Sequence, residues 1–177
     1  QRRFYRRIAD EARRIDPARL TPDERLSRDL LLHEAAMGLA LQAFPGHLLP
    51  MSHMGSLPVR LGEWASGTGP QPMRTVANYE HFLRRLAGLP GWIRQAIVNM
   101  EQGIAQGVVL PRPLVERTLP QLDALLPENA ELSPYLAGVR AFPDTVPEAD
   151  QRRLGLAYRK LVATRIAPAV QRLRAFM

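Results

Sequence analysis

The chain has 177 residues, a length suited to one ordinary domain with a substantial core. Hydrophobic residues make up 46% and charged residues 23%, a balance that excludes wholesale disorder, a collagen-like repeat and a coiled-coil rod. No residue is cysteine, which excludes disulfides, thiolate zinc sites and a cysteine nucleophile.

The net charge of +7 is carried almost entirely by arginine, because Lys160 is the only lysine. The 24 basic residues are interleaved with 17 acidic ones, which weakens the signal for a polyanion-binding protein. We interpret the densest basic cluster as a solvated helix face; it comprises Arg2, Arg3, Arg6, Arg7, Arg13 and Arg14. The sequence shows no platform of interleaved aromatic and basic residues and no glycine-rich phosphate loop, so we do not expect it to bind nucleic acid.

No apolar run reaches the roughly 18 residues of a membrane span, and no signal peptide is visible, so we expect no membrane-spanning segment. The chain begins at Gln1 without an initiator methionine, and we expect it to be a fragment of a longer protein. Its compartment stays unknown, with the cell envelope or periplasm open if an export signal was removed.

Two helices are predicted at the start of the chain. The first covers residues 2–14, and the second begins at a capping box in which Thr21 caps and Glu24 closes the box. This second helix should run to about Phe44. From Leu30 onward it is apolar almost all round, which predicts the central, buried helix of the domain.

Residues 45–72 contain proline and glycine too often to sustain a long helix, so they predict one long irregular loop. Loops of this length in compact domains usually line a functional surface or are disordered. The many apolar residues of this loop favour packing along the domain.

Helices then resume. Thr75 caps a helix over 76–86, and the turn at 89–91 leads into a helix over 92–106, so we expect a helical hairpin. Gly107 follows where a left-handed cap belongs. A glycine inside a helix costs about 1 kcal/mol relative to alanine, so Gly103 indicates that another backbone or a ligand comes close, with helix packing the favoured cause.

The last third of the chain predicts a helix over 114–126, in which Pro120 either kinks the helix or starts a second segment. A second capping box, from Thr145 to Glu148, should open a long helix to about Phe176, which Pro168 bends. No alternating strand pattern competes, apart from a weak one at 107–110. The predicted fold is therefore all-α, an irregular array of about six to eight helices in a single domain over residues 1–177.

His33-Glu34 and, further on, His47 raise the question of a zinc enzyme. A zinc-protease helix needs a second histidine four residues after the first, but that position is Met37. His33 and Glu34 could still meet His47 and His53 in a folded site; we favour a structural His33, hydrogen-bonded inside a buried helix. We expect no metal site in this chain.

Ser52, His53 and Ser56 are the only neighbouring serine and histidine residues. Adjacent residues rarely reach triad geometry, and neither serine lies in a Gly-x-Ser-x-Gly elbow. Paired carboxylates fall at helix starts or in loops, where capping explains them. We therefore assign no catalytic residue.

Two segments carry a resemblance to a known family. Residues 71–86 contain a "Thr-x-x-x-Tyr" helix start, and residues 99–113 contain "Met-x-x-Gly-Ile-x-x-Gly-x-x-x-Pro". In order and spacing they resemble the amino-terminal half of a bacterial family catalogued as domain-of-unknown-function family 885. The similarity extends over most of the chain, ending with residues 168–173.

Members of that family are larger, mostly helical, and resemble Glu-zincin metallopeptidases, a class of hydrolase. Their His-Glu-x-x-Pro-Gly-His metal motif lies in the carboxy-terminal half. In this chain His33-Glu34 is separated from Pro45-Gly46-His47 by helix, so no catalytic residue carries over. The resemblance implies zinc as the cofactor of the parent protein and no cofactor in this chain.

The resemblance thus implies the non-catalytic helical amino-terminal region of a zinc-dependent peptidase, forming part of its substrate-channel wall. We expect His47, His53, Arg74 and Arg112 to line the channel, with the carboxy-terminal catalytic half and a peptide substrate as partners. An exposed apolar face would also allow self-association. One alternative is an independent helical module whose basic face binds an anionic partner or another protein; another is a self-contained enzyme using His47 or His53.

Overall fold

A computed structural model describes residues 2–177, and the secondary structure of this range is helical, with no strand. The prediction of an all-α, irregular multi-helix array is confirmed. The chain divides into two compact units, one ending at Gly46 and one running from His47 to Met177. The expectation of a single domain stays a prediction.

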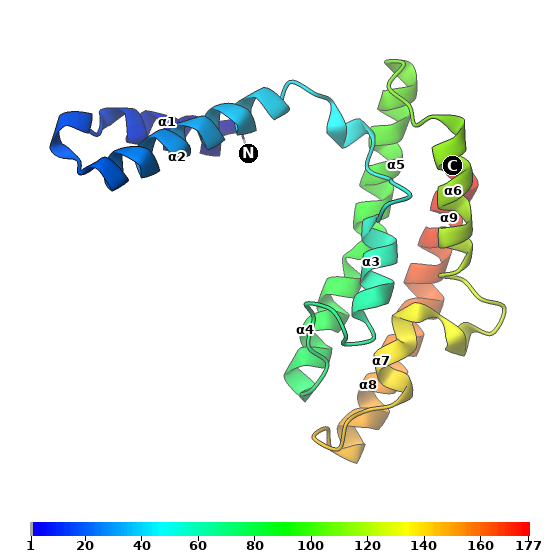
Figure 1. Ribbon diagram of the computed structural model, residues 1–177. Coiled ribbons are helices and arrows are strands. Elements are labelled where there is room, and N and C mark those ends of the chain that lie inside the picture. Colours follow the sequence, from blue (N-terminus) through cyan, green and yellow to red (C-terminus); the bar gives the residue numbers. More distant parts are fainter. Residues whose placement is uncertain (1) are drawn as a thin grey trace. The chain divides into compact units, whose positions relative to one another are not determined.

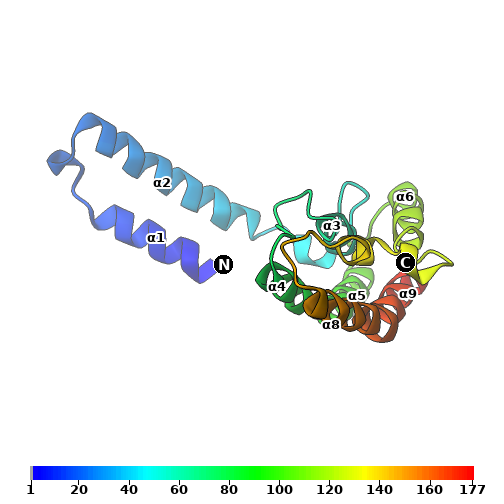
Figure 2. The same ribbon diagram turned by 90° about the horizontal axis from the view of Figure 1, so that it is seen from below.

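The first unit is an antiparallel hairpin of α1 (Arg2–Arg14) and α2 (Pro22–Leu41) (Figures 1 and 2). The predicted capping box is confirmed, because the Thr21 hydroxyl accepts from the Glu24 amide while the Glu24 carboxylate accepts from the Thr21 amide at 2.8 Å. Helix α2 ends three residues before Phe44, just ahead of Pro45.

Small residues close the seam between the two helices. Its buried positions include Ala9, Ala12, Ala35 and Gly38. A Cβ atom on Gly38 would lie 2.6 Å from the ring of Tyr5, so glycine allows this aromatic ring to lie flat on α2. The seam is therefore tight, yet it buries little apolar area.

Helix α2 is not the buried central helix that the sequence predicts. Only Ala35 and Gly38 are buried in it, whereas leucines and Met37 on the far side are exposed. His33 is exposed too, so its assignment as a hydrogen-bonded histidine inside a buried helix is wrong. The reason is that α1 covers one face of α2 and no element of the hairpin covers the other.

In the second unit, the prediction of one irregular loop over 45–72 needs correction. The segment contains a 3₁₀ turn, Gly46–Leu48, and helix α3, Leu57–Trp64. Pro58 lies in the first turn of α3, where a missing N–H costs nothing and the fixed φ favours the helix. The density of proline and glycine around α3 hides this start signal.

Helices α4 (Val76–Ala87) and α5 (Leu89–Ala105) do not form the expected hairpin. The residue between them, Gly88, has φ −78° and ψ −20°, which is right-handed helical backbone. The chain therefore bends at this point rather than reversing, and Pro90 interrupts the hydrogen-bond ladder only locally (Figure 1). Thr75 caps α4 as predicted.

Four helices complete the second unit: α6 (Arg112–Asp123), which contains Pro120, α7 (Ala137–Arg140), α8 (Glu148–Leu161) and α9 (Ala167–Phe176). The predicted capping box before α8 is wrong. Thr145 donates instead to the carbonyl of Arg74, and Pro147 occupies the N-cap position without a side-chain cap.

Helices α8 and α9 run on through a π-helical turn, Val162–Ile166. Pro168 cannot donate to the carbonyl of Thr164, and its ring crowds that carbonyl, so the wider turn relieves the clash. The irregularity near Pro168 is therefore a wider helical turn, and the bend that the sequence predicts there stays a prediction.

Two long helical rods organise the second unit. Helices α4 and α5 form one rod, and α8 and α9 form the other. Helix α4 packs on α8 and α5 packs on α9, so the two rods run side by side in the same direction (Figure 1). Buried tyrosines tie the surrounding elements to them. The Tyr158 hydroxyl donates to the Tyr79 carbonyl at 2.7 Å, the Tyr79 hydroxyl donates to the Gly138 carbonyl at 3.0 Å, and the Tyr135 hydroxyl donates to the Pro58 carbonyl at 3.0 Å.

Removing the Tyr135 hydroxyl tests this arrangement. Tyr135→Phe removes the buried hydroxyl that donates to the Pro58 carbonyl, and we expect the free energy of unfolding to fall by about 1–2 kcal/mol in urea titrations. The matched control is Tyr5→Phe, since the Tyr5 hydroxyl makes no hydrogen bond within residues 2–177. Equal stabilities of the two variants would contradict the expectation.

The same hydroxyls predict a loss of stability at high pH. Burial raises the pKa of Tyr135 well above its usual range, and burial raises the pKa of Tyr158 likewise, with a smaller contribution from nearby Tyr79. These groups stay protonated in the folded state but ionise in the unfolded chain, so their stabilisation is complete below about pH 10 and is lost as the pH rises further. Unfolding titrations from neutral to alkaline pH should show a slope about 1.4 kcal/mol per pH unit shallower for Tyr135→Phe than for the wild type. Equal slopes of unfolding free energy against pH for the two proteins would contradict this expectation.

Candidate functional site

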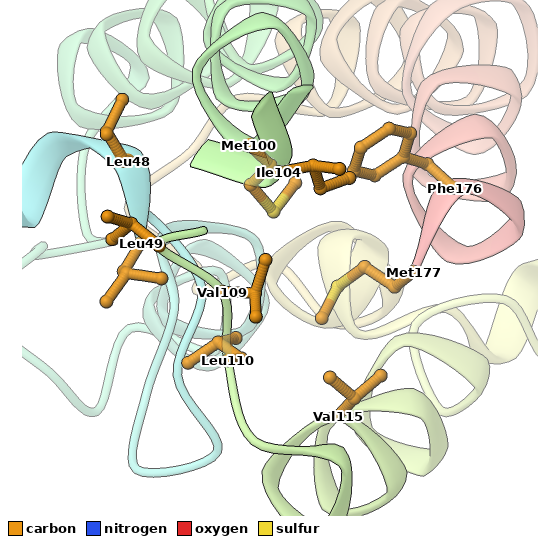
Figure 3. A pocket seen from close by; sticks show the side chains of 10 residues that line it. Leu48, Leu49, Met100, Ile104, Val109, Leu110, Val115, Phe176 and Met177 are labelled. Atoms are coloured by element: carbon orange, nitrogen blue, oxygen red, sulfur yellow. The ribbon is translucent and has the colours of Figure 1, made fainter. Parts of the chain in front are cut away.

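An apolar cleft of about 150 Å³ opens on the second unit (Figure 3). Every side chain around it is hydrophobic. The lining residues are Leu48, Leu49, Met100, Ile104, Val108, Val109, Leu110, Val115, Phe176 and Met177. Four separate segments thus converge here: the turn at 46–49, the end of α5 with the following strand-like stretch, the start of α6, and the end of α9.

A Schellman motif shapes one wall of the cleft. The Val108 amide donates to the Gly103 carbonyl at 2.8 Å and the Gly107 amide donates to the Ile104 carbonyl at 3.2 Å. Gly107 has φ +70°, so the predicted left-handed cap is confirmed. The motif ends α5 and turns residues 108–110 back across the opening.

Gly103 lets two backbone segments approach α5. A Cβ atom at this position would lie 2.6 Å from the Val108 carbonyl oxygen and 3.3 Å from the Leu48 carbonyl oxygen. The expectation that another backbone comes close to Gly103 is confirmed, but the favoured cause is wrong, because the approaching residues belong to the stretch after α5 and to the turn Gly46–Leu48 rather than to a packed α-helix. The Asn99 side-chain amide also donates to the His47 carbonyl at 3.0 Å, which fastens the 46–48 turn to the same helix.

An ion pair holds the remaining wall. The Arg174 guanidinium donates to both carboxylate oxygens of Asp123, at 2.8 and 3.3 Å, and so joins the end of α9 to α6. This hydrogen-bonded pairing lowers the pKa of the Asp123 carboxyl. Both residues are about half exposed, so we assign the pair an orienting role rather than a large contribution to stability.

None of the four residues expected to line a channel belongs to the lining of the cleft, although two flank it. His47 directly precedes Leu48 and is exposed, and Arg112 begins α6 with its side chain paired to Glu116 at 2.8 Å. The structure brings His53 to α6 instead, where its carbonyl accepts from Gln121 at 2.7 Å.

Arg74 is exposed in the segment before α4, and its carbonyl is held by Thr145. The assignment of these four residues to a channel stays a prediction.

The serine and histidine neighbours do not form a reactive group. Ser56 is 2% exposed and its hydroxyl has no partner within the described chain, and the Ser52 hydroxyl accepts from the Met54 amide at 3.1 Å. The Nδ1 atom of His53 is buried and likewise unpaired. A substrate cannot reach Ser56 at this depth, and among the described residues neither serine hydroxyl is hydrogen-bonded to the His53 ring.

Among residues 2–177, no three histidine, aspartate or glutamate side chains gather in a way that could hold a metal ion. His33-Glu34 lies on the exposed side of α2 in the first unit, whereas His47 begins the second unit. Over the same range, no helix is both long and apolar enough to span a membrane.

The cleft is not evident from the sequence, because its residues look like ordinary core positions. The available signal was the run of Val108, Val109 and Leu110, interpreted only as a weak strand pattern, directly after a glycine cap. Leu48-Leu49 gave a second signal. Nothing in the linear pattern shows that these segments meet the last residues of α9.

The fold and the cleft define an all-α protein with an apolar cleft on its second unit. Over residues 1–177 the chain matches the family described as "Bacterial protein of unknown function (DUF885)", and it belongs to that family. No curated protein and no solved structure matches it.

Adding a methyl group at Gly103 should disturb two walls of the cleft at once. We expect Gly103→Ala to lower the free energy of unfolding by about 1–3 kcal/mol, because the obstructing atoms are backbone oxygens, and this exceeds the gain in helix propensity of about 1 kcal/mol. Gly91→Ala in the same helix is the control, since its Cβ would meet only the flexible end of Arg94 at 3.7 Å. Urea unfolding measures both, and a Gly103→Ala variant as stable as Gly91→Ala would contradict the proposed crowding.

Proposed function

We propose that this chain is the non-catalytic helical amino-terminal region of a zinc-dependent peptidase, and that it forms part of the wall of the substrate channel. The observation that carries the proposal is the all-apolar cleft in a chain without a complete metal motif. Membership of the bacterial DUF885 family supports it, because the resemblance on which the peptidase assignment rests is to members of that family.

The residues of this chain do not fit a zinc site. Helix α2 offers one imidazole and one carboxylate at His33-Glu34, and the position that would supply the second imidazole is Met37. Zinc therefore belongs to the carboxy-terminal half of the proposed parent protein. The role left to this chain is to bind and orient a peptide and to exclude water from it.

The cleft suits that role chemically. Its walls carry no charge, so it favours apolar side chains and disfavours ions. A cavity of about 150 Å³ is the size that accommodates one aromatic ring. His47 and Arg112, at its margin, have exposed polar groups that can contact the backbone of a peptide lying across the opening.

The alternative of an independent binding module draws on a different observation. Of the six arginines on α1, Arg7 and Arg13 pair with carboxylates, whereas the other four form no ion pair among the described residues. Such a face attracts anions. Association with DNA or RNA that weakens steeply with salt would favour this alternative.

Metal analysis separates these assignments. We expect the purified 177-residue chain to retain no stoichiometric zinc after dialysis and to hydrolyse no peptide. We expect the longer product of the same gene to bind zinc and to lose both zinc and hydrolysis when the histidines of a His-Glu-x-x-Pro-Gly-His motif beyond residue 177 are changed to alanine.

Two results would count against the proposal. One is tight zinc together with hydrolysis in the short chain, which His47→Ala and His53→Ala would trace to the self-contained enzyme. The other is a longer product without zinc or peptidase activity, which would leave the independent module as the better assignment.

A further inference from the structure

The strongest feature outside the cleft is an apolar stripe on α2. It consists of Leu26, Leu30, Met37, Leu41 and Phe44, which are 48–71% exposed. At 100° per residue, the four positions inside α2 fall within an arc of about 60°, and Phe44 follows just after the end of the helix. The buried positions Ala35 and Gly38 lie on the other side, against α1. The stripe is therefore the outer face of the hairpin.

The hairpin lacks the buried area that an independent unit of its size needs. Its seam is made of alanine and glycine, and none of its large apolar side chains is fully buried. Helical units this small are rarely stable without a further packing partner. Covering the stripe supplies the missing apolar contact.

We propose that the occupant of this stripe is the same stripe of a second copy of the chain. A closed two-fold interface requires a self-complementary patch, and the four stripe residues inside α2 have this property. Leu26 and Leu41 lie at equal distances on either side of the peptide bond between His33 and Glu34, and Leu30 and Met37 do the same. In an antiparallel pair centred there, Leu26 of one copy meets Leu41 of the other.

The area agrees with a specific dimer. If each of the five side chains contributes about 100 Å², the stripe covers roughly 500 Å² per copy and about 1,000 Å² in the pair, the minimum that a specific interface needs. His33 and Glu34 lie at the two edges of the stripe rather than along its centre, so both can stay hydrated in the pair. Two hairpins packed through α2 then give a four-helix arrangement.

Sedimentation and light scattering across the micromolar range test the oligomeric state of the intact 177-residue chain. We expect a dimer, and we expect Leu30→Glu to raise its dissociation constant about 100-fold, because the carboxylate would be buried against Met37 of the second copy. Leu156→Glu is the matched control, since Leu156 is a 70% exposed leucine of α8 in the other unit. Circular dichroism confirms that each variant keeps its helix content.

Disulfide trapping independently tests the register of the two α2 helices in the dimer. Because the chain has no native cysteine, only the introduced thiols can form a disulfide. A single cysteine at His33→Cys lies close to its counterpart across the two-fold axis, so it should give a cross-linked dimer under mild oxidation. Ala36→Cys, exposed on the same helix but away from the stripe, should not. Mixing Leu30→Cys with Met37→Cys should give a mixed disulfide.

A monomeric wild-type chain would overturn the proposal and leave the catalytic half of the parent protein as the occupant. A dimer that Leu30→Glu does not weaken, or equal cross-linking at positions 33 and 36, would overturn it as well. None of these outcomes depends on zinc or on peptide hydrolysis. The dimer and the proposed function can therefore fail separately.

Discussion

Three buried tyrosine hydroxyls hold the second unit together, and each donates to a main-chain carbonyl 59 to 79 residues away in sequence. Two of these bonds form a relay, because Tyr158 donates to the carbonyl of Tyr79, whose own hydroxyl donates to Gly138. The relay connects α8 to α4 and α4 to α7. A buried hydroxyl without a hydrogen-bond partner costs free energy. The need to satisfy both hydroxyls therefore constrains how α4, α7 and α8 are placed relative to one another.

That placement determines where the cleft can form. The tyrosines fix the half of the unit in which α4, α7 and α8 meet, while the ends of α5 and α9 continue past this core. At those ends the chain is held by other contacts. These are the Schellman motif at Gly107, the close backbone approach at Gly103, and the ion pair between Arg174 and Asp123. Leu48 is nearly fully buried in the wall, whereas Ile104 and Val109 are more than half exposed. The opening thus has a fixed floor and an accessible rim.

Local signals in the sequence predict local structure well. The caps at Thr21 and Thr75 and the left-handed Gly107 are all present, because each depends on atoms within a few residues. Gly88 and Leu57–Trp64 were mispredicted for a different reason: proline and glycine are read as chain breakers, although glycine also adopts helical backbone and proline fits a first helical turn. Packing of the surrounding elements decides between these states, and a short window of sequence does not contain it.

Burial is the property that sequence alone predicts least well in this chain. The nearly all-round apolar character of α2 is the pattern of a helix enclosed on several sides, but within the hairpin only α1 covers it. The ten apolar residues of the cleft show a second kind of mismatch. Their residue types predict a packed core, but they surround an opening. A hydrophobic pattern indicates that a surface is covered in the folded protein, but it does not indicate which element or partner covers it. A five-residue apolar stripe over positions 26–44, on a hairpin whose seam is made of small residues, is therefore better explained by a missing packing partner than by misfolding, because the capping box of α2 and the Tyr5–Gly38 contact are both well formed.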